Sequence, residues 1–197
     1  MSEQAFMQRA VALALEKMRA NSGGPFGAVI VRNDTIIAEG WNEVTSNNDP
    51  TAHAEIVAIR RACTLLGAFN LPDCDIYTSC EPCPMCLGAI YWARLRRVYY
   101  ANTRTEAAHV GFDDEFIYGE VGLEPGLRRI PHIRLMTDNA RVAFTEWATS
   151  PGEDSVLIIV EGHPFAAAVS VGRVSIRRND PSLPFDIQFC CDAPQLF

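Results

Sequence analysis

His53-Ala54-Glu55 and Pro82-Cys83-Pro84-Met85-Cys86 are the two stretches of this 197-residue chain from which its fold and chemistry can be inferred. The first offers an imidazole and, two residues later, a carboxylate, and the second offers two thiols. Imidazole and thiolate are ligands that zinc prefers, and three protein ligands leave a tetrahedral zinc ion one open position, as in catalytic sites. The two stretches therefore predict a zinc site with His53, Cys83 and Cys86 as ligands.

The carboxylate of Glu55 indicates a catalytic site rather than a structural one. Zinc lowers the pKa of a bound water to about 7, and a carboxylate outside the metal shell can move that water's proton to a substrate atom. A closed structural site is the alternative, because Cys80 lies three residues before Cys83 and would complete a Cys3His set. That alternative leaves Glu55 without a role, and Cys80 also fits as a small core side chain at a strand end.

The predicted position of His53 and Glu55 on one helix limits where the metal can lie. Asp49 is expected to cap a helix whose first position is Pro50, so that His53 and Glu55 lie near its start. Residues i and i+2 of a regular helix point about 200° apart. Both side chains can therefore reach one metal only if the site lies beyond the end of the helix.

The pattern of apolar residues along the chain predicts an α/β fold. Strands are expected at residues 26–32, 35–41, 75–79, 98–101 and 133–136. Helices are expected from the N-terminus to near residues 23–24, and at 49–66, 82–94 and 138–147. Asn33-Asp34 suits the two-residue turn of a hairpin. The order of these elements predicts a three-layer α/β/α sandwich around a mixed five-stranded sheet.

Composition and charge bound the kind of partner. The chain is 48% apolar, carries a formal charge of −7 and has seven cysteines. An acidic balance argues against binding to a nucleic-acid backbone and fits a small neutral substrate. The odd cysteine count without a disulfide-rich composition favours a reducing compartment, so we expect a cytoplasmic protein. The longest apolar run, residues 156–160, is too short to span a membrane.

The character of the sequence changes at residue 150. Prolines interrupt β-branched stretches from there to the end of the chain. We therefore expect a zinc-binding domain at residues 1–149 and a C-terminal extension at 150–197. The extension fits a docked hairpin, a partner-binding arm or a partly disordered tail, and its sequence does not choose between them.

Several segments resemble the cytidine deaminase-like superfamily, in which H-x-E followed by P-C-x-x-C marks zinc-dependent nucleobase deaminases. These segments are Gly24-Pro25-Phe26-Gly27-Ala28-Val29-Ile30-Val31, Asn42, Asp49-Pro50-Thr51-Ala52-His53-Ala54-Glu55 and Thr78-Ser79-Cys80-Glu81-Pro82-Cys83-Pro84-Met85-Cys86. Within the superfamily, residues 88–94 followed by Gly111-Phe112-Asp113-Asp114 look most like the bacterial guanine deaminases. The resemblance runs from about residue 4 to Trp147.

The resemblance implies a function and a set of site residues. It implies hydrolytic deamination of guanine to xanthine and ammonia, one zinc ion per chain and a homodimer, often with exchanged C-terminal segments. His53, Cys83 and Cys86 would bind zinc, and Glu55 would shuttle protons. The implied substrate contacts are Asn42, which would hydrogen-bond the base, Asp114, which would read or protonate the purine edge, and Phe26 and Trp92, which would wall the base.

Alternatives remain for the function and for individual residues. The substrate could be another base or nucleoside, such as transfer-RNA adenosine, cytosine or guanosine, or the chain could be a non-catalytic zinc-stabilised interaction domain. Asn42 also fits a turn, Asp114 a helix cap, and Phe26 and Trp92 the core. The relatives close their site with a C-terminal aromatic residue, but no aromatic residue occurs here between residues 148 and 161.

Overall fold

The structure is a computed structural model that describes residues 2–135 and 139–149. Met1–Arg134 form one compact unit, and the helix α7 (Val142–Thr149) belongs to a second unit that begins at Leu135. The predicted extension at residues 150–197 lies outside the described residues. The candidate site lies in the first unit.

A four-stranded mixed sheet forms the centre of the first unit. Its strands are β1 (Gly27–Arg32), β2 (Thr35–Trp41), β3 (Cys74–Cys80) and β4 (Arg97–Asn102). The order is β2-β1-β3-β4, with β1 antiparallel to both neighbours and β3 parallel to β4. The central strand β3 is buried along its whole length. The turn at Asn33 and Asp34 has φ angles of 49° and 56°, which confirms the predicted two-residue hairpin.

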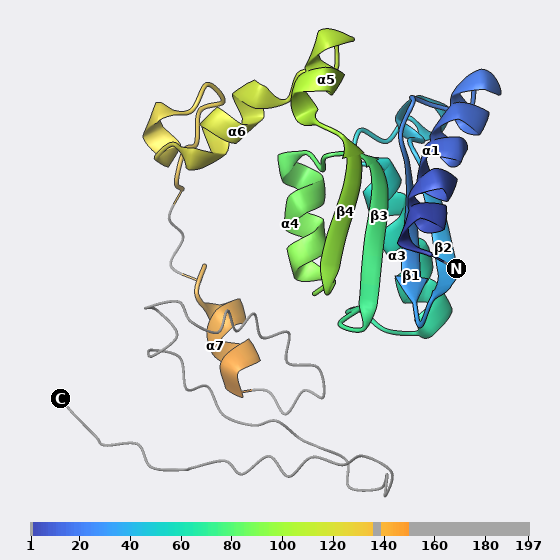
Figure 1. Ribbon diagram of the computed structural model, residues 1–197. Helices are drawn as coiled ribbons and strands as arrows, with labels where there is room; N and C mark the ends of the chain where they lie inside the picture. The colour runs from blue at the N-terminus through green and yellow to red at the C-terminus, as the bar shows by residue number, and fades with distance from the viewer. Residues whose placement is uncertain (1, 136–138, 150–197) are drawn as a thin grey trace, which may run out of the picture. The chain divides into compact units, whose positions relative to one another are not determined.

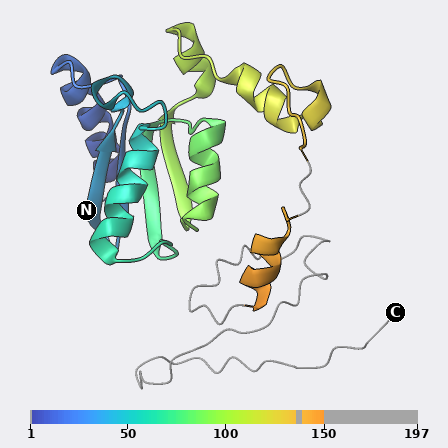
Figure 2. The ribbon, with the colours of Figure 1, turned by 180° about the vertical axis from the view of Figure 1, so that it is seen from behind.

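Helices cover both faces of the sheet and make three layers. The helix α1 (Glu3–Arg19) packs on one face, where Phe6 and Ala10 meet Val29 and Tyr77 (Figure 1). The helices α3 (Ala54–Leu66) and α4 (Pro84–Trp92) cover the other face (Figure 2). The predicted three-layer α/β/α architecture is therefore confirmed.

Two glycines allow the helices to approach the sheet closely. A Cβ atom at Gly27 would overlap the carbonyl of Ala10 in α1. A Cβ atom at Gly40 would overlap the carbonyl of Ala54 and the amide nitrogen of Ala58 in α3. Because Gly40 faces the first turn of α3, it sets the position of the helix end that carries His53 and Glu55.

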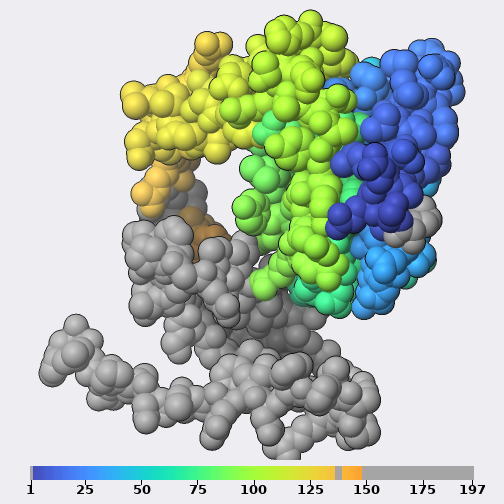
Figure 3. Space-filling model, in the orientation of Figure 1, coloured from blue at the N-terminus to red at the C-terminus, as the bar shows by residue number. Residues whose placement is uncertain are grey.

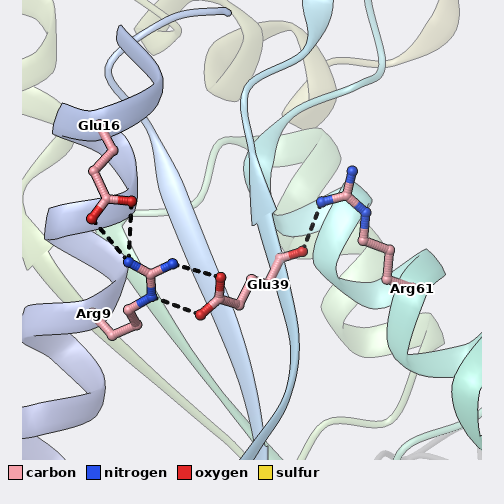
Figure 4. Close-up of polar contacts among 4 residues, drawn as sticks. All are labelled: Arg9, Glu16, Glu39 and Arg61. Carbon is pink, nitrogen blue, oxygen red and sulfur yellow. Dashed lines mark hydrogen bonds and ion pairs between the residues drawn. The ribbon is translucent and has the colours of Figure 1, made fainter. Parts of the chain in front are cut away.

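An ion pair from one helix layer and a hydrogen bond from the other cover the edge strand β2. Arg9 of α1 makes two hydrogen bonds, of 2.7 and 2.8 Å, to the carboxylate of Glu39 and two more, of 3.0 and 3.2 Å, to that of Glu16 (Figure 4). Arg61 of α3 donates to the Glu39 carbonyl at 2.9 Å. The Arg9 guanidinium holds the pKa of Glu39 below its usual range. A charged edge of this kind disfavours pairing with a strand of another molecule.

The sheet differs from the prediction at its other edge. Four strands, not five, occur in the described ranges, because residues 133–135 of the expected fifth strand have no regular secondary structure and Met136 lies outside the description. Ile133 and Leu135 are exposed, and a short segment without a neighbour to supply backbone hydrogen bonds does not form a strand. The last helix begins at Val142 rather than at residue 138.

The described residues also contain shorter helices. They are α2 (Val44–Asn47), α5 (Arg104–His109), α6 (Glu115–Gly122) and the 3-10 helix η1 (Pro125–Leu127). None of α2, α5, α6 and η1 contains a buried residue. Within the part of the chain that the structure describes, no helix has both the length and the apolar character needed to cross a membrane.

Candidate active site

The two motifs lie at the N-termini of α3 and α4. His53 is the N-cap of α3 and Cys83 is the N-cap of α4, and both have extended backbones with ψ angles of 157° and 169°. The predicted starts at residues 49 and 82 are therefore wrong. Asp49 instead accepts the amide of Thr51 at 2.8 Å in a local turn. Since His53 precedes the helix and Glu55 lies in its first turn, the 200° separation expected within a regular helix does not apply.

The three predicted ligands converge. His53 Nδ1 lies 3.5 Å from Cys83 Sγ and 3.6 Å from Cys86 Sγ. Zinc–nitrogen and zinc–sulfur bonds of about 2.0 and 2.3 Å at a tetrahedral angle place the nitrogen and sulfur atoms about 3.5 Å apart. These residues therefore fit zinc. Among the described residues Cys80 is not part of the ligand group, so the closed Cys3His alternative is not supported.

The electrostatics of the Cys83 thiol favour metal binding. A hydrogen bond from the Cys86 thiol, helped by His53, lowers the pKa of Cys83 to about 4. The same bond and burial raise the pKa of Cys86, and the contact with Cys83 raises that of His53. Cys83 is therefore a thiolate at neutral pH, the form that binds metal and that a helix N-terminus stabilises.

Glu55 is held beside the ligands without being one of them. Its side chain is 6% exposed. One carboxylate oxygen accepts the Thr78 hydroxyl at 2.9 Å, and the other accepts the Cys86 thiol at 3.4 Å. Burial raises the pKa of Glu55 above its usual range. A carboxyl group that holds a proton more readily than usual is suited to act as both general base and general acid.

A cavity of about 610 Å³ opens in front of these groups. Its lining contains six of the eight predicted site residues, which are Phe26, Asn42, His53, Glu55, Cys83 and Asp114. Cys86 is fully buried behind the lining. Trp92 does not line the cavity, and 60% of its surface is exposed at the end of α4. The predicted site is thus brought together except for Trp92.

Asn42 has a fixed orientation. Its side-chain oxygen accepts the amides of Gly24 and Val44 at 3.4 and 3.3 Å, and its own backbone amide donates to the Phe26 carbonyl at 3.1 Å. With the oxygen engaged in this way, the Nδ2 group remains as the donor at the cavity wall. The side chain can therefore offer a hydrogen bond to an acceptor on a bound ring.

The opposite wall comes from residues 104–114. Phe112 meets Phe26 edge to face, with ring centroids 4.8 Å apart. Asp114 lies just before α6, and burial followed by the nearby Cys83 thiolate raises the pKa of its carboxyl group. An aromatic pair beside carboxyl groups suits a flat ring with N–H donors.

Three lining residues carried no role in the sequence interpretation. Glu81 and Arg104 line the cavity, and Phe112 supplies half of the aromatic pair. The helix α5, which begins at Arg104, could have been found from Thr103 and Glu106, because each side chain caps the other's backbone amide at its start. No local signal indicated Glu81, whose carboxylate accepts the Arg104 amide at 3.0 Å.

Comparison with known proteins gives consistent matches. Residues 1–102 match the family described as the cytidine and deoxycytidylate deaminase zinc-binding region. The guanine deaminase of Bacillus subtilis (strain 168) is 56% identical over 147 residues, which cover 75% of this chain and 94% of that protein. A tRNA-specific adenosine deaminase of Agrobacterium fabrum is 46% identical over 93 residues, covering 45% of this chain and 61% of that protein.

Among solved structures, too, a guanine deaminase matches more of this chain than a second protein does. An X-ray structure of guanine deaminase from Bacillus subtilis superposes with a TM-score of 0.78 at 53% identity and covers 80% of this chain and 100% of its own. A second solved protein, in complex with 2,6-diaminopurine, superposes with a TM-score of 0.55 at 33% identity and covers 57% of this chain and 63% of its own. The similarity to the first extends well beyond the residues around the metal site.

Proposed function

Because this chain belongs to the cytidine and deoxycytidylate deaminase family, we propose that it is a zinc-dependent aminohydrolase that converts guanine and water to xanthine and ammonia. The observation that carries the proposal is the buried Glu55 carboxyl group beside a zinc-type donor set, in a cavity that Asn42 and Asp114 also line. The Bacillus subtilis relative, which is 56% identical, is a guanine deaminase.

The cavity wall supports binding of a purine base. Asn42 Nδ2 donates to a ring acceptor, and Asp114 hydrogen-bonds the N–H groups of the purine edge or protonates it. Phe26 and Phe112, whose rings contact each other, together offer the base one apolar surface. A site that pairs its buried polar groups with one base can reject analogues by up to about 10⁴–10⁵-fold.

Glu55 moves the protons of the reaction. When bound, zinc polarises a water molecule and lowers its pKa to about 7. Glu55 would take one proton from a water held in the site while the oxygen of that water bonds to carbon 2 of guanine, and would pass the proton to ring nitrogen 3. It then transfers the second proton to the amino group, the carbon–nitrogen bond breaks, and ammonia leaves. The Thr78 hydroxyl keeps the carboxyl group oriented through both transfers.

Two other functions fit less well. A transfer-RNA deaminase is expected to present a basic surface, whereas this chain carries a formal charge of −7. The acidic residues Glu81, Asp113 and Asp114 also line the cavity. A non-catalytic zinc-stabilised domain would not need a buried carboxyl group next to its metal ligands, because burying such a group costs free energy.

An ammonia-release assay tests the choice of substrate. The zinc-loaded protein is offered guanine, guanosine, adenine, cytosine and a transfer-RNA anticodon stem at equal concentration. We expect guanine to react fastest and to yield one xanthine per ammonia. Ammonia from cytosine or the anticodon stem, with none from guanine, would overturn the proposed substrate and leave the zinc chemistry intact.

We propose further that the protein is a homodimer and acts in the cytoplasm. Five cysteines are free in the described part of the chain, as expected in a reducing compartment. Exposed apolar and aromatic side chains cluster on α4 and on the edge strand β4, which lies uncovered in the space-filling view (Figure 3). They are Leu87, Tyr91, Trp92, Val98 and Tyr100. Sedimentation velocity tests the dimer, and a monomer at micromolar concentration would contradict it.

A further inference from the structure

Two hydrogen bonds join the segment that carries Asp114 to the loop that carries the zinc ligand Cys83. The Tyr118 hydroxyl of α6 donates to the carbonyl of Pro82 at 2.8 Å. The backbone amide of Arg104, the first residue of α5, donates to the Glu81 carboxylate at 3.0 Å. Residues 103–122, here called the cap segment, are therefore attached to the two residues that immediately precede Cys83.

Arg104 also holds Tyr118 in place. Its guanidinium carbon lies 4.6 Å from the centre of the Tyr118 ring, and its Nε lies 3.5 Å from the Glu115 carboxylate. A cation over an aromatic face is attracted to it and restricts the tilt of the ring. The Tyr118 hydroxyl is thereby directed at Pro82.

The first turn of α6 connects Tyr118 to Asp114. The amide of Tyr118 donates to the Asp114 carbonyl at 3.3 Å, and the amide of Ile117 donates to the same carbonyl at 2.9 Å. Asp114 is thus separated from Pro82 by one backbone hydrogen bond and one tyrosine side chain. On the other side of Pro82, the next residue is Cys83.

Few apolar contacts compete with this connection. The helix α6 has eight residues and none of them is buried. A helix this short is not stable alone in water, so its position depends on the contacts that it makes. In the cap segment those contacts are polar except for the ring of Phe112, which meets Phe26, and none of them involves a buried residue of α5 or α6.

We propose that Tyr118 is a positioning residue that fixes Asp114 relative to the zinc site through its hydrogen bond to Pro82. The inference rests on the proposed function, since it assigns Asp114 to base recognition. Loss of the bond lets α6 shift and displaces the Asp114 carboxyl group from the purine edge. A displacement of about 1 Å can cost about 10²-fold in rate.

A pair of matched variants tests this role. Tyr118→Phe removes only the hydroxyl group. Tyr99→Phe is the control, because the Tyr99 hydroxyl also donates to an oxygen, of Glu3 at 2.9 Å, and its ring also lies near a guanidinium, that of Arg97. We expect Tyr118→Phe to lower kcat/KM about 10- to 100-fold with zinc content unchanged, and Tyr99→Phe to leave kcat/KM within about twofold. Equal effects of the two variants would overturn the proposal.

A double-mutant cycle distinguishes positioning from general destabilisation. If Tyr118 acts through Asp114, Tyr118→Phe has little further effect on kcat/KM in an Asp114→Asn background. Multiplication of the two effects would contradict the proposal. The cycle is run with whichever base the wild-type protein deaminates, so a wrong substrate is detected separately in the wild-type assay.

Hydrogen exchange gives a readout that is independent of activity. In the zinc-loaded protein, Tyr118→Phe should speed amide exchange in residues 112–122 relative to wild type, and Tyr99→Phe should not. Unchanged exchange of this segment in Tyr118→Phe would overturn the proposal even if activity fell.

Discussion

The metal-binding body and the cap segment are built differently. In the body, Glu55, Thr78 and Cys86 are all buried, and they lie on elements that pack on the sheet. In the cap segment α5 and α6 bury no residue, and they join the body through a few polar contacts. The comparison indicates that Glu55 and the predicted zinc ligands are held by close packing, whereas the position of Asp114, a proposed base contact, depends on contacts that small changes can shift.

The largest expected effect comes from the body. Cys86→Ala removes one of the three predicted zinc ligands. The variant should therefore lose zinc, and its activity should fall by more than about 10³-fold, equivalent to several kcal/mol. Cys74→Ala is the control because Cys74 is also buried but lies outside the ligand group. Zinc per chain is measured by atomic absorption. Retention of a full equivalent by Cys86→Ala would contradict the ligand assignment.

A change beneath the site tests the packing of the body. Gly40→Ala introduces a methyl group that overlaps the backbone of Ala54 and Ala58, and we expect it to lower the free energy of unfolding by about 1–3 kcal/mol. Activity should fall too, because α3 carries Glu55. Gly88→Ala on α4 is the control, since its Cβ would meet no atom within 4 Å. Urea unfolding measures both variants, and equal stability would argue against close packing at Gly40.

A change in the cap segment should affect binding while leaving the body intact. Asp114→Asn removes a charged hydrogen-bond partner of the base, worth about 1.5–3 kcal/mol, so kcat/KM for guanine should fall about 10- to 150-fold. Zinc content and the free energy of unfolding should stay near wild type. Loss of zinc in this variant would show that a change in the cap segment also disturbs the metal-binding body.

The smallest effect concerns the acid stability of the body. Two guanidinium groups, of Arg96 and Arg97, hold the pKa of Asp75 below its usual range. The ionised carboxylate therefore stabilises the fold above the unfolded-state pKa of about 3.9, and this stabilisation is lost as the pH falls through the folded-state pKa. Asp75→Asn should cost about 1–2 kcal/mol at pH 7 and less at pH 3. A difference from wild type that is constant with pH would contradict this account.

Much of the body could be predicted from the sequence because its signals are local. The hairpin turn follows from Asn33 and Asp34, which tolerate positive φ angles. The start of α3 was misplaced because Asp49 and Pro50 signal a turn as well as a helix cap. The fifth strand could not be judged locally, since a strand needs a partner that the sequence does not name.

The site residues also divide into those with a local sequence signal and those without one. Local spacing pairs Cys83 with Cys86 at the start of one helix, whereas His53 lies 30 residues before Cys83 and was assigned to the same site by combining its H-x-E motif with the P-C-x-x-C motif. The contact between Tyr118 and Pro82 spans 36 residues, so no local pattern could indicate it. The same holds for Trp92, because its spacing from the motif gave no information about which side of α4 faces the cavity.

The turnover of Glu55→Gln in zinc-loaded protein tests the central claim most directly. Glutamine keeps the size of the side chain and an oxygen that can accept the Thr78 hydroxyl, but it cannot take up or release the protons of the reaction. The account predicts a full equivalent of zinc, an unchanged free energy of unfolding and a fall in kcat of about 10²–10⁴-fold. Turnover within a fewfold of wild type would contradict it.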